Sequence, residues 1–238
     1  MDNQVWETFE KINNGRRAIR YFTNEPVRDD DVKAILAAGQ FAPSSGNLQP
    51  YELHWVKDKE VCKKIGKACN QQRAASTVST FIVIVATYKN LTKTYKDFLE
   101  NIENSAFNDE KAKMYYKKKK AEIGFFSNIL SLKVFGLFYE IFTLITPLAV
   151  IAPIGQNAML QWTIKNSIFA AQTILLAASA RGIDSCPMEG FNAIQIAKIL
   201  KLKRGYVIPL VIALGKRNPD KEIEIRWRQS FAKIVKVH

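Results

Sequence analysis

The sequence predicts a sandwich of helices on a buried sheet, of the α/β or α+β class. Two continuous apolar runs rich in β-branched residues, at 81–86 and 206–214, are typical of strands that are buried on both faces. A longer segment, 159–181, carries apolar side chains at helical spacing. Because helical and strand patterns interleave with no repeat and no linker between them, we expect a single domain over residues 1–238.

Turn and cap signals divide the first part of the chain into elements. Asn13-Asn14-Gly15 is a typical helix end, and three acids, Asp29 to Asp31, favour the positive N-terminal end of a helix. The predicted elements are helices over 5–13, 29–39 and 59–79, and strands over 53–56 and 81–86.

The second part of the chain continues the alternation. Residues 90–122 are charged and helical in pattern, and Arg181-Gly182 ends the long helix. The predicted elements after it are a short strand over 183–186, a helix over 194–200, a buried strand over 206–214 and an edge strand over 231–237.

The composition argues against a metal centre and a disulfide framework. The chain has three cysteines and two histidines among 238 residues, and it contains no C-x-x-C pair. The first residues, Met1 to Gln4, lack the basic and apolar regions of a signal peptide. We therefore expect a reducing compartment, with a cytoplasmic location.

The net charge of +13 indicates either an anionic partner or a solvated basic surface. Nucleic acid, an anionic membrane and phosphate-bearing small ligands are the three candidates. The densest run, Lys117 to Lys120, has no glycine or interleaved aromatic residue that would stack on bases. We interpret it as a solvated helix face and expect no nucleic-acid partner.

Residues 124–153 are unusually apolar. A transmembrane helix needs ~20 apolar residues in a row. Lys133, Glu140, Pro147 and Pro153 interrupt this segment, which disfavours a membrane span. A buried helical hairpin, or a cover over a subunit contact, is the favoured interpretation, and peripheral membrane contact through 117–153 is the alternative.

Two motifs are rich in arginine, whose planar guanidinium can donate two parallel hydrogen bonds to a phosphate. The first is Arg16-Arg17-Ala18-Ile19-Arg20, which follows the first helix. The second is Arg226-Trp227-Arg228, in which side chains two residues apart point the same way if the segment is extended. Taken alone, each motif is more simply interpreted as a solvated basic surface.

Two further motifs offer hydrogen-bonding groups of other kinds. The run Ala42-Pro43-Ser44-Ser45-Gly46-Asn47-Leu48-Gln49-Pro50-Tyr51 has more hydroxyls and amides than a turn needs. The segment Cys186-Pro187-Met188-Glu189-Gly190-Phe191 is a strand that ends in a turn, where backbone N–H groups can face a ligand. An ordinary connection with Gly190 at positive φ is the alternative for the second motif.

The four motifs resemble, in order and spacing, those of the FMN-dependent nitroreductase family, from about residue 10 to the C-terminus. The resemblance implies an α+β fold with a mixed, mostly antiparallel sheet flanked by helices, and an apolar helical insertion at about 90–155. It also implies a homodimer with FMN at the subunit interface. One departure is Ala18, which stands where the family often has serine.

The resemblance also implies roles for these motifs. Arg16 is expected on the FMN phosphate, Arg20 near the N1/O2 edge of the ring, and the Pro43–Asn47 run at the partner chain's flavin. Glu189 and Gly190 would place a backbone N–H near flavin N5. The implied cofactor-binding residues are Arg16, Arg17, Ala18, Arg20, Pro43, Ser44, Ser45, Asn47, Gln72 (or a neighbour within Asn70–Arg73), Pro187, Met188, Glu189, Gly190, Arg226 and Arg228.

The implied activity is an NAD(P)H oxidoreductase that reduces nitroaromatic, quinone or related small-molecule acceptors through flavin N5. Ping-pong kinetics and no catalytic side chain are expected, because the cofactor carries the chemistry. One alternative is other chemistry on the same fold, a reductive dehalogenase or a flavin-consuming oxidase. The other is a basic membrane- or nucleic-acid-binding protein without catalysis.

Overall fold

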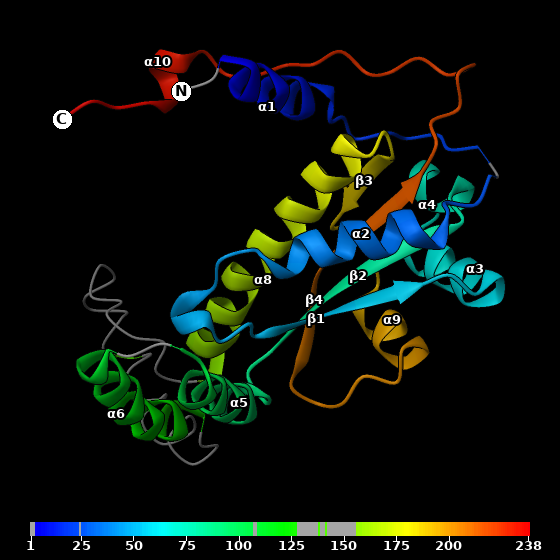
Figure 1. Ribbon diagram of the computed structural model, residues 1–238. Coiled ribbons are helices and arrows are strands. Elements are labelled where there is room, and N and C mark those ends of the chain that lie inside the picture. The colour runs from blue at the N-terminus through cyan, green and yellow to red at the C-terminus, as the bar shows by residue number, and fades with distance from the viewer. Residues whose placement is uncertain (1–2, 24, 107–108, 128–137, 139–140, 142–155) are drawn as a thin grey trace.

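The computed structural model describes residues 3–23, 25–106, 109–127, 138, 141 and 156–238, and its centre is a four-stranded sheet (Figure 1). The strand order is β1-β2-β4-β3, and every neighbouring pair is antiparallel. The strands are β1 (Tyr51–Val56), β2 (Thr80–Thr87), β3 (Asp184–Met188) and β4 (Tyr206–Gly215). Ala18 also forms an isolated parallel bridge to Ser185 of β3, outside the named strands. The predicted, mostly antiparallel sheet is confirmed, and within the described residues all its strand pairs are antiparallel.

Helices cover both faces of the sheet (Figure 1). One face packs against α2 (Asp29–Gln40) and α8 (Gln156–Ala180). The other face packs against α3 (Lys59–Ala68), α4 (Arg73–Thr77) and α9 (Ala193–Ile199). The α+β sandwich that the sequence predicts is therefore the observed architecture.

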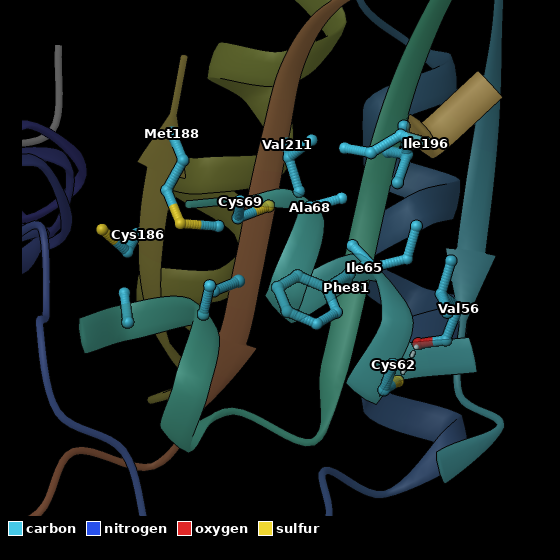
Figure 2. Close-up of a cluster of buried hydrophobic side chains, with 14 of the residues drawn as sticks. Val56, Cys62, Ile65, Ala68, Cys69, Phe81, Cys186, Met188, Ile196 and Val211 are labelled. Atoms are coloured by element: carbon cyan, nitrogen blue, oxygen red, sulfur yellow. Dashed lines mark hydrogen bonds between the residues drawn. The ribbon is translucent and has the colours of Figure 1, made fainter. Parts of the chain in front are cut away.

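Strand β2 shows why an uninterrupted apolar run forms the centre of this sheet. Successive side chains of a strand point to opposite faces, so both sets must be apolar when both faces are covered. Phe81 and Val83 belong to the α3–α9 side, which Figure 2 shows, whereas Ile82 and Ile84 belong to the α2–α8 side. The sequence pattern thus locates the innermost strand.

Two groups of helices lie at opposite ends of the sandwich (Figure 1). At one end, α1 (Asn3–Gly15) runs beside the C-terminal segment, which contains α10 (Phe231–Ile234). At the other end, α5 (Leu91–Asn104) packs on α6 (Glu110–Ser127) beside the first turns of α8. These two ends carry the features on which the functional argument depends.

The single helix predicted over 59–79 is wrong, because the structure has two helices there. Asn70 and Gln71 adopt positive φ angles of 54° and 51°, which break the helix between α3 and α4. Asparagine tolerates this backbone region better than most residues, so Asn70 carried a signal for the break. The turn brings Gln72 to the N-cap of α4.

The edge strand predicted over 231–237 is also wrong. The segment forms one helical turn, α10, and every residue from Lys216 onward except Arg217 and Asn218 is exposed. Among the described residues, no strand lies beside this segment. Without a partner that supplies a ladder of hydrogen bonds, an alternating sequence has no reason to extend as a strand.

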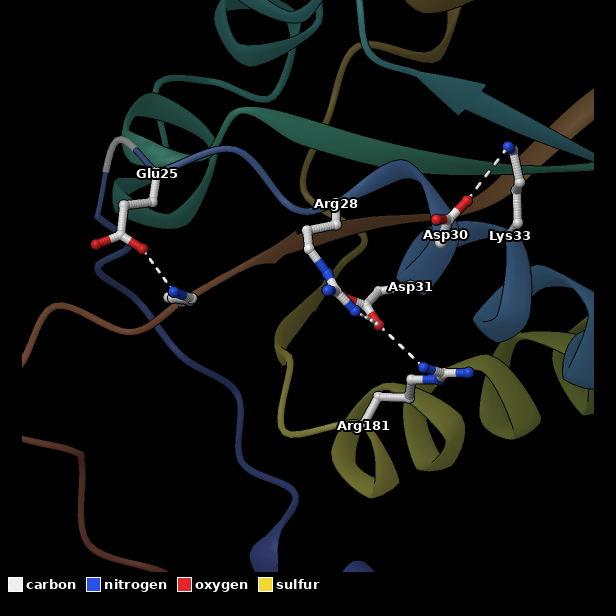
Figure 3. Close-up of polar contacts among 7 residues, drawn as sticks. Glu25, Arg28, Asp30, Asp31, Lys33 and Arg181 are labelled. Atoms are coloured by element: carbon white, nitrogen blue, oxygen red, sulfur yellow. Dashed lines mark hydrogen bonds and ion pairs between the residues drawn. The ribbon is translucent and has the colours of Figure 1, made fainter.

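The acids at the start of α2 lie in its first turn, and Arg28 is the N-cap, without a side-chain capping bond. Asp31 is buried and accepts hydrogen bonds from two arginines. Arg28 Nε donates at 2.9 Å, and Arg181 Nη1 donates at 3.0 Å from the end of α8 (Figure 3). The carboxylate therefore ties α2 to α8, and the hydrogen bond from Arg28 is the main cause that lowers the pKa of Asp31.

Residues 128–137, 139–140 and 142–155, most of the apolar segment at 124–153, lie outside the described residues. The expectation of a helical hairpin or cover there stays a prediction. Within the ranges described above, no helix has both the length and the apolar character that a membrane crossing requires.

Candidate functional site

Four arginines from the two ends of the chain lie together beside α1. The Arg226 guanidinium donates to the backbone carbonyl of Asn14 and, at 3.2 Å, to that of Arg16. Arg17 donates to the carbonyl of Glu224. Partial burial, followed by the positive charges of Arg228, Arg226 and Arg17, lowers the pKa of Arg16. The structure thus brings together both arginine motifs, although 209 positions separate Arg17 from Arg226.

A cleft of about 490 Å³ opens beside Arg16 and Arg17, between α1 and the C-terminal end of α8. Lys11 and Arg217 also line this cleft. The nearby carboxylate, Asp184, is already paired with Arg217 through hydrogen bonds of 2.9 and 3.0 Å from Nε. The local charge is therefore strongly positive, which suits a bound anion.

Arg20 and Ala18 attach the first arginine motif to β3. Ala18 forms the parallel bridge to Ser185, and Arg20 Nη1 lies 3.8 Å from Cys186 Sγ. The Arg20 Nε atom also lies 3.6 Å from a carboxylate oxygen of Glu224. Arg20 therefore contacts β3 at Cys186, two residues before the strand ends at Met188, and lies close to the turn at 187–190.

The turn after β3 contacts the segment between α3 and α4. Pro187 and Met188 are the last residues of β3, and Glu189 and Gly190 form the turn. The Gly190 carbonyl accepts hydrogen bonds from the side-chain amides of Gln72, at 2.5 Å, and Asn70, at 3.1 Å. Gln72 is thus the position within 70–73 that lies closest to this turn.

Gly190 is not at positive φ, so that part of the alternative interpretation is wrong, whereas an ordinary connection at this turn stays open. A Cβ at position 190 would lie 3.0 Å from Gln72 Nε2. The close approach of the Gln72 amide, and not a left-handed backbone, accounts for a glycine here.

The loop at 42–51 is built as a compact, exposed turn. Ser45 to Asn47 form one turn of 3₁₀ helix, and Gly46, Asn47 and Gln49 have φ angles of 60°, 54° and 43°. The Ser44 hydroxyl accepts from Gln49 N–H at 3.0 Å. Pro43, Ser45 and Asn47 are exposed, and Ser44 is half-buried.

Asn166 of α8 holds this loop, and the sequence analysis missed it. Its Oδ1 accepts from Ser45 N–H at 2.7 Å, while its Nδ2 donates to the carbonyl of Trp162 at 2.8 Å. The side chain is only 3% exposed. An amide side chain within a mostly apolar helix was the available signal, because a buried amide requires partners.

The predicted site residues therefore fall into two separate groups within one chain. The arginine segments, β3 and the turn at 187–190 are joined through Arg20 and Cys186. The Pro43–Asn47 loop lies at the other end of α2, near α5 and α6 (Figure 1). Among the described residues, no hydrogen bond or ion pair joins this loop to the arginines or to the turn.

The three thiols are poor nucleophiles. Burial raises the pKa of Cys62 and of Cys69 to about 11, and it also raises the pKa of Cys186. A thiolate is the reactive form, so these side chains are inert near neutral pH. No metal-binding group of histidine, cysteine and acidic side chains occurs in the part of the chain that the structure describes.

Comparison with known proteins agrees with this fold. The family model described as "Nitroreductase family" matches residues 14–216. SERP2086 of Staphylococcus epidermidis is 26% identical over 200 residues, which cover 83% of this chain and 80% of that protein.

Solved structures show the same architecture. The crystal structure of ydfN from Bacillus subtilis has a TM-score of 0.77 at 20% identity, and the match covers 98% of this chain and 100% of that one. A structure from Exiguobacterium sibiricum, solved in complex with FMN, has a TM-score of 0.68 at 20% identity, with 97% of each chain covered.

The fold and motifs define an α+β sandwich in which the two arginine segments meet beside α1. The protein belongs to the nitroreductase family. The expected family is thereby confirmed.

Proposed function

We propose that this protein is an FMN-dependent NAD(P)H oxidoreductase that reduces nitroaromatic, quinone or related acceptors. The observation that carries the proposal is the cluster of Arg16, Arg17, Arg226 and Arg228 beside α1. Four like charges in one place repel one another, and a phosphate dianion would relieve this repulsion. The family match and the FMN-bound neighbour support the same cofactor, and relatives carry the words NAD(P)H nitroreductase in their names.

The residues present fit FMN. Arg16 and Arg17, with Arg226 and Arg228, would bind the phosphate. Arg20 would lie at the N1/O2 edge of the ring, where a cation stabilises the anionic reduced form. The Gln72 amide and the turn at 187–190 would contact the ring, with a backbone N–H of Glu189 or Gly190 near N5.

We propose that the Pro43–Asn47 loop completes the flavin site of a second copy. Its exposed hydroxyls and amides face no other predicted site residue of their own chain. Large apolar side chains are exposed on α1 and in the C-terminal segment, among them Trp6, Ile225 (95% exposed) and Trp227 (70%). Such surfaces commonly mark protein contacts, so they support a homodimer.

Bound FMN supplies reversible two-electron chemistry at N5. Overall, NAD(P)H and one proton reduce a quinone to its quinol, and NAD(P)⁺ is released. The protein's own residues bind the phosphate, orient the ring and stabilise negative charge near N1. Because no described thiol or metal-binding group supplies a nucleophile, we assign no catalytic side chain. Parallel double-reciprocal plots are expected if NAD(P)H and the acceptor use the site in turn.

The visible absorption spectrum tests the proposal. The purified protein should show flavin bands, either as isolated or after FMN is added and unbound FMN is removed. The double variant Arg226→Ala/Arg228→Ala should release the cofactor, because the phosphate loses two partners of charge-assisted hydrogen bonds.

A matched control is the pair Lys233→Ala and Lys236→Ala, which removes the same charge from the same segment outside the cluster. FMN should be retained in this control. A protein that never binds FMN would refute the proposed function, and full retention in the Arg226/Arg228 variant would remove these residues from the phosphate site.

A further inference from the structure

A groove of about 700 Å³ follows α3, between this helix and the segment 75–79, which includes the end of α4. It lies on the side of the sandwich away from α5 and α6 (Figure 1). Three lysines of α3 line it, and they are Lys59, Lys63 and Lys67. Since the groove shares no lining residue with the cleft beside the arginine cluster, it is a separate surface of the molecule.

The three lysines form one row. Successive members are four residues apart, so their side chains leave the same side of the helix about 6 Å apart along its axis. All three are exposed, and among the described residues no acidic side chain lines the groove and no carboxylate pairs with them. Cys62 also lines the groove, but burial raises the pKa of its thiol to about 11, so it adds no negative charge near neutral pH. The groove therefore carries a row of unneutralised positive charge.

The floor of the groove is fixed by contacts of the backbone. Cys62 Sγ donates to the carbonyls of Val56, at 3.4 Å, and of Ser79, at 3.3 Å (Figure 2). Gly66 approaches α4 so closely that a Cβ there would lie 2.7 Å from the carbonyl oxygen of Ala75. The lysine row thus stands on a preformed surface, and a ligand binds there without the cost of ordering the backbone beneath it.

Two serines on the opposite wall can accept hydrogen bonds. Ser76 Oγ donates to the carbonyl of Arg73 at 3.0 Å, and Ser79 Oγ donates to the carbonyl of Glu25 at 3.5 Å. Because each hydroxyl has then used its one proton, its oxygen remains as an acceptor. A polypeptide backbone offers N–H donors to such oxygens, whereas a phosphodiester backbone offers acceptors only. This wall therefore favours a peptide over a nucleic acid.

We propose that this groove binds an extended acidic segment of a partner protein. In an extended chain every second side chain points the same way, with a repeat of about 6.6 Å that is close to the spacing of the lysine row. Alternate acidic side chains pair with the three lysines in turn, and backbone N–H groups reach Ser76 and Ser79. Among the described residues no aromatic side chain lines the groove to stack a base. A concave surface also suits a single chain better than a flat bilayer.

Fluorescence anisotropy of a labelled peptide tests this inference. The peptide has about ten residues, in which glutamate and serine alternate, and its affinity is measured at low salt, where exposed charges are least screened. The triple variant Lys59→Gln/Lys63→Gln/Lys67→Gln should weaken binding about tenfold, the size expected for three exposed ion pairs.

The matched control removes the same charge from exposed lysines outside the groove, in the triple variant Lys64→Gln/Lys198→Gln/Lys203→Gln. Its affinity for the peptide should stay within about twofold of the wild type, because more distant charges are screened. A second peptide tests the spacing: it has the same number of glutamates, one at every third position, so that neighbouring acids point to opposite faces. It should bind the wild type about fivefold more weakly, since two of the three ion pairs are lost.

The outcomes decide between the possible ligands. An excess of FMN should not displace the alternating peptide, and displacement would place the peptide at the arginine cluster. The groove is not a peptide site if the peptide fails to bind, binds the groove variant as tightly as the wild type, or binds no better than the second peptide. Tighter binding of oligothymidylate of equal charge, or of phosphatidylserine vesicles, would overturn the proposal in favour of nucleic acid or membrane.

Discussion

Asn166 of α8 anchors the Pro43–Asn47 loop through a side-chain hydrogen bond. Its amide satisfies Ser45 N–H on one side and the Trp162 carbonyl on the other. The backbone of this loop has three residues at positive φ, so it needs an external hydrogen bond to keep its shape.

We therefore predict that Asn166→Leu reduces the free energy of unfolding by about 1 kcal/mol, the net contribution of a typical hydrogen bond, because the Ser45 N–H loses its partner in a partly buried contact. FMN affinity should fall with it if the loop completes a flavin site. Chemical denaturation and flavin titration measure the two effects. Thr173→Val, whose hydroxyl bonds only within α8, is the control and should change neither. Unchanged stability in the Asn166 variant would show that the loop does not depend on this bond.

At the level of elements, the contact between α3 and α4 leaves no room for a side chain at Gly66. A Cβ there would lie 2.7 Å from the backbone carbonyl oxygen of Ala75. Backbone cannot move aside as a flexible side chain can, so one helix must shift.

Gly66→Ala should therefore destabilise the protein by about 1–3 kcal/mol, the usual cost of overpacking. Gly124→Ala, in α6, is the matched control, because no atom of the described residues lies within 4 Å of its Cβ position. Alanine favours helix over glycine, so this control should be neutral or stabilising by up to about 1 kcal/mol. Equal effects in both variants, measured by denaturant unfolding, would contradict the close contact.

The Asp31 link between α2 and α8 gives a pH dependence of defined sign. The hydrogen bond from Arg28 is the largest cause that lowers the pKa of Asp31 in the folded state. The contribution of Asp31 to the free energy of unfolding is therefore complete above its unfolded-state pKa of about 4. The contribution is lost as the pH falls through the lowered pKa.

Asp31→Asn should consequently lower Tm at pH 7, and the difference from the wild type should shrink at the acid end of a pH series below about 4. Asp30→Asn is the control, because Asp30 is exposed and pairs only with exposed Lys33 at 3.5 Å. A Tm difference that stays constant down to the acid limit would show that Asp31 does not act through its charge.

Secondary structure was predicted most accurately from the sequence where a single physical property determined the element. The buried strands 81–86 and 206–214 needed only uniform apolar character, and both are present as β2 and β4. The break at Asn70-Gln71 was missed because apolar periodicity continued across it, while backbone φ decided the outcome. The prediction of a strand over 231–237 was wrong, because strand formation depends on a neighbouring strand. The sequence pattern of one segment does not reveal whether such a neighbour is present.

The same distinction applies to the site. The two arginine motifs were expected to act together on one phosphate, and the structure brings these two segments into contact. The contact of Asn166 with the loop was not predicted, because it depends on how α8 packs against the loop. A buried amide indicates that a partner exists, but the local sequence does not say which distant segment supplies it.

At the scale of the whole molecule, the C-terminal segment from residue 219 onward is exposed along its whole length. It carries Arg226 and Arg228 as well as the exposed Trp227 and Phe231. In the proposed homodimer, this segment would therefore contribute both to FMN binding and to the subunit contact.

Truncation after Asp220 should give a monomer that does not retain FMN, because the apolar contacts and two phosphate ligands are lost together. Light scattering after size exclusion measures the mass, and the flavin bands measure retention. Removal of residues 236–238 alone is the control and should leave a flavin-bound dimer. A truncated protein that remains dimeric would place the subunit contact elsewhere.

The arginine cluster beside α1 also makes the thermal stability of the protein depend on dissolved anions. When no anion is bound, mutual repulsion among the guanidinium groups opposes the docking of the C-terminal segment on α1. Any ion that binds only the folded form adds RT ln(1 + [L]/Kd) to its stability. Cofactor-free protein should thus melt at a higher temperature in phosphate than in chloride at equal ionic strength, and the gain should disappear once FMN is bound. The choice of purification buffer will then decide how much of the cofactor-free protein survives.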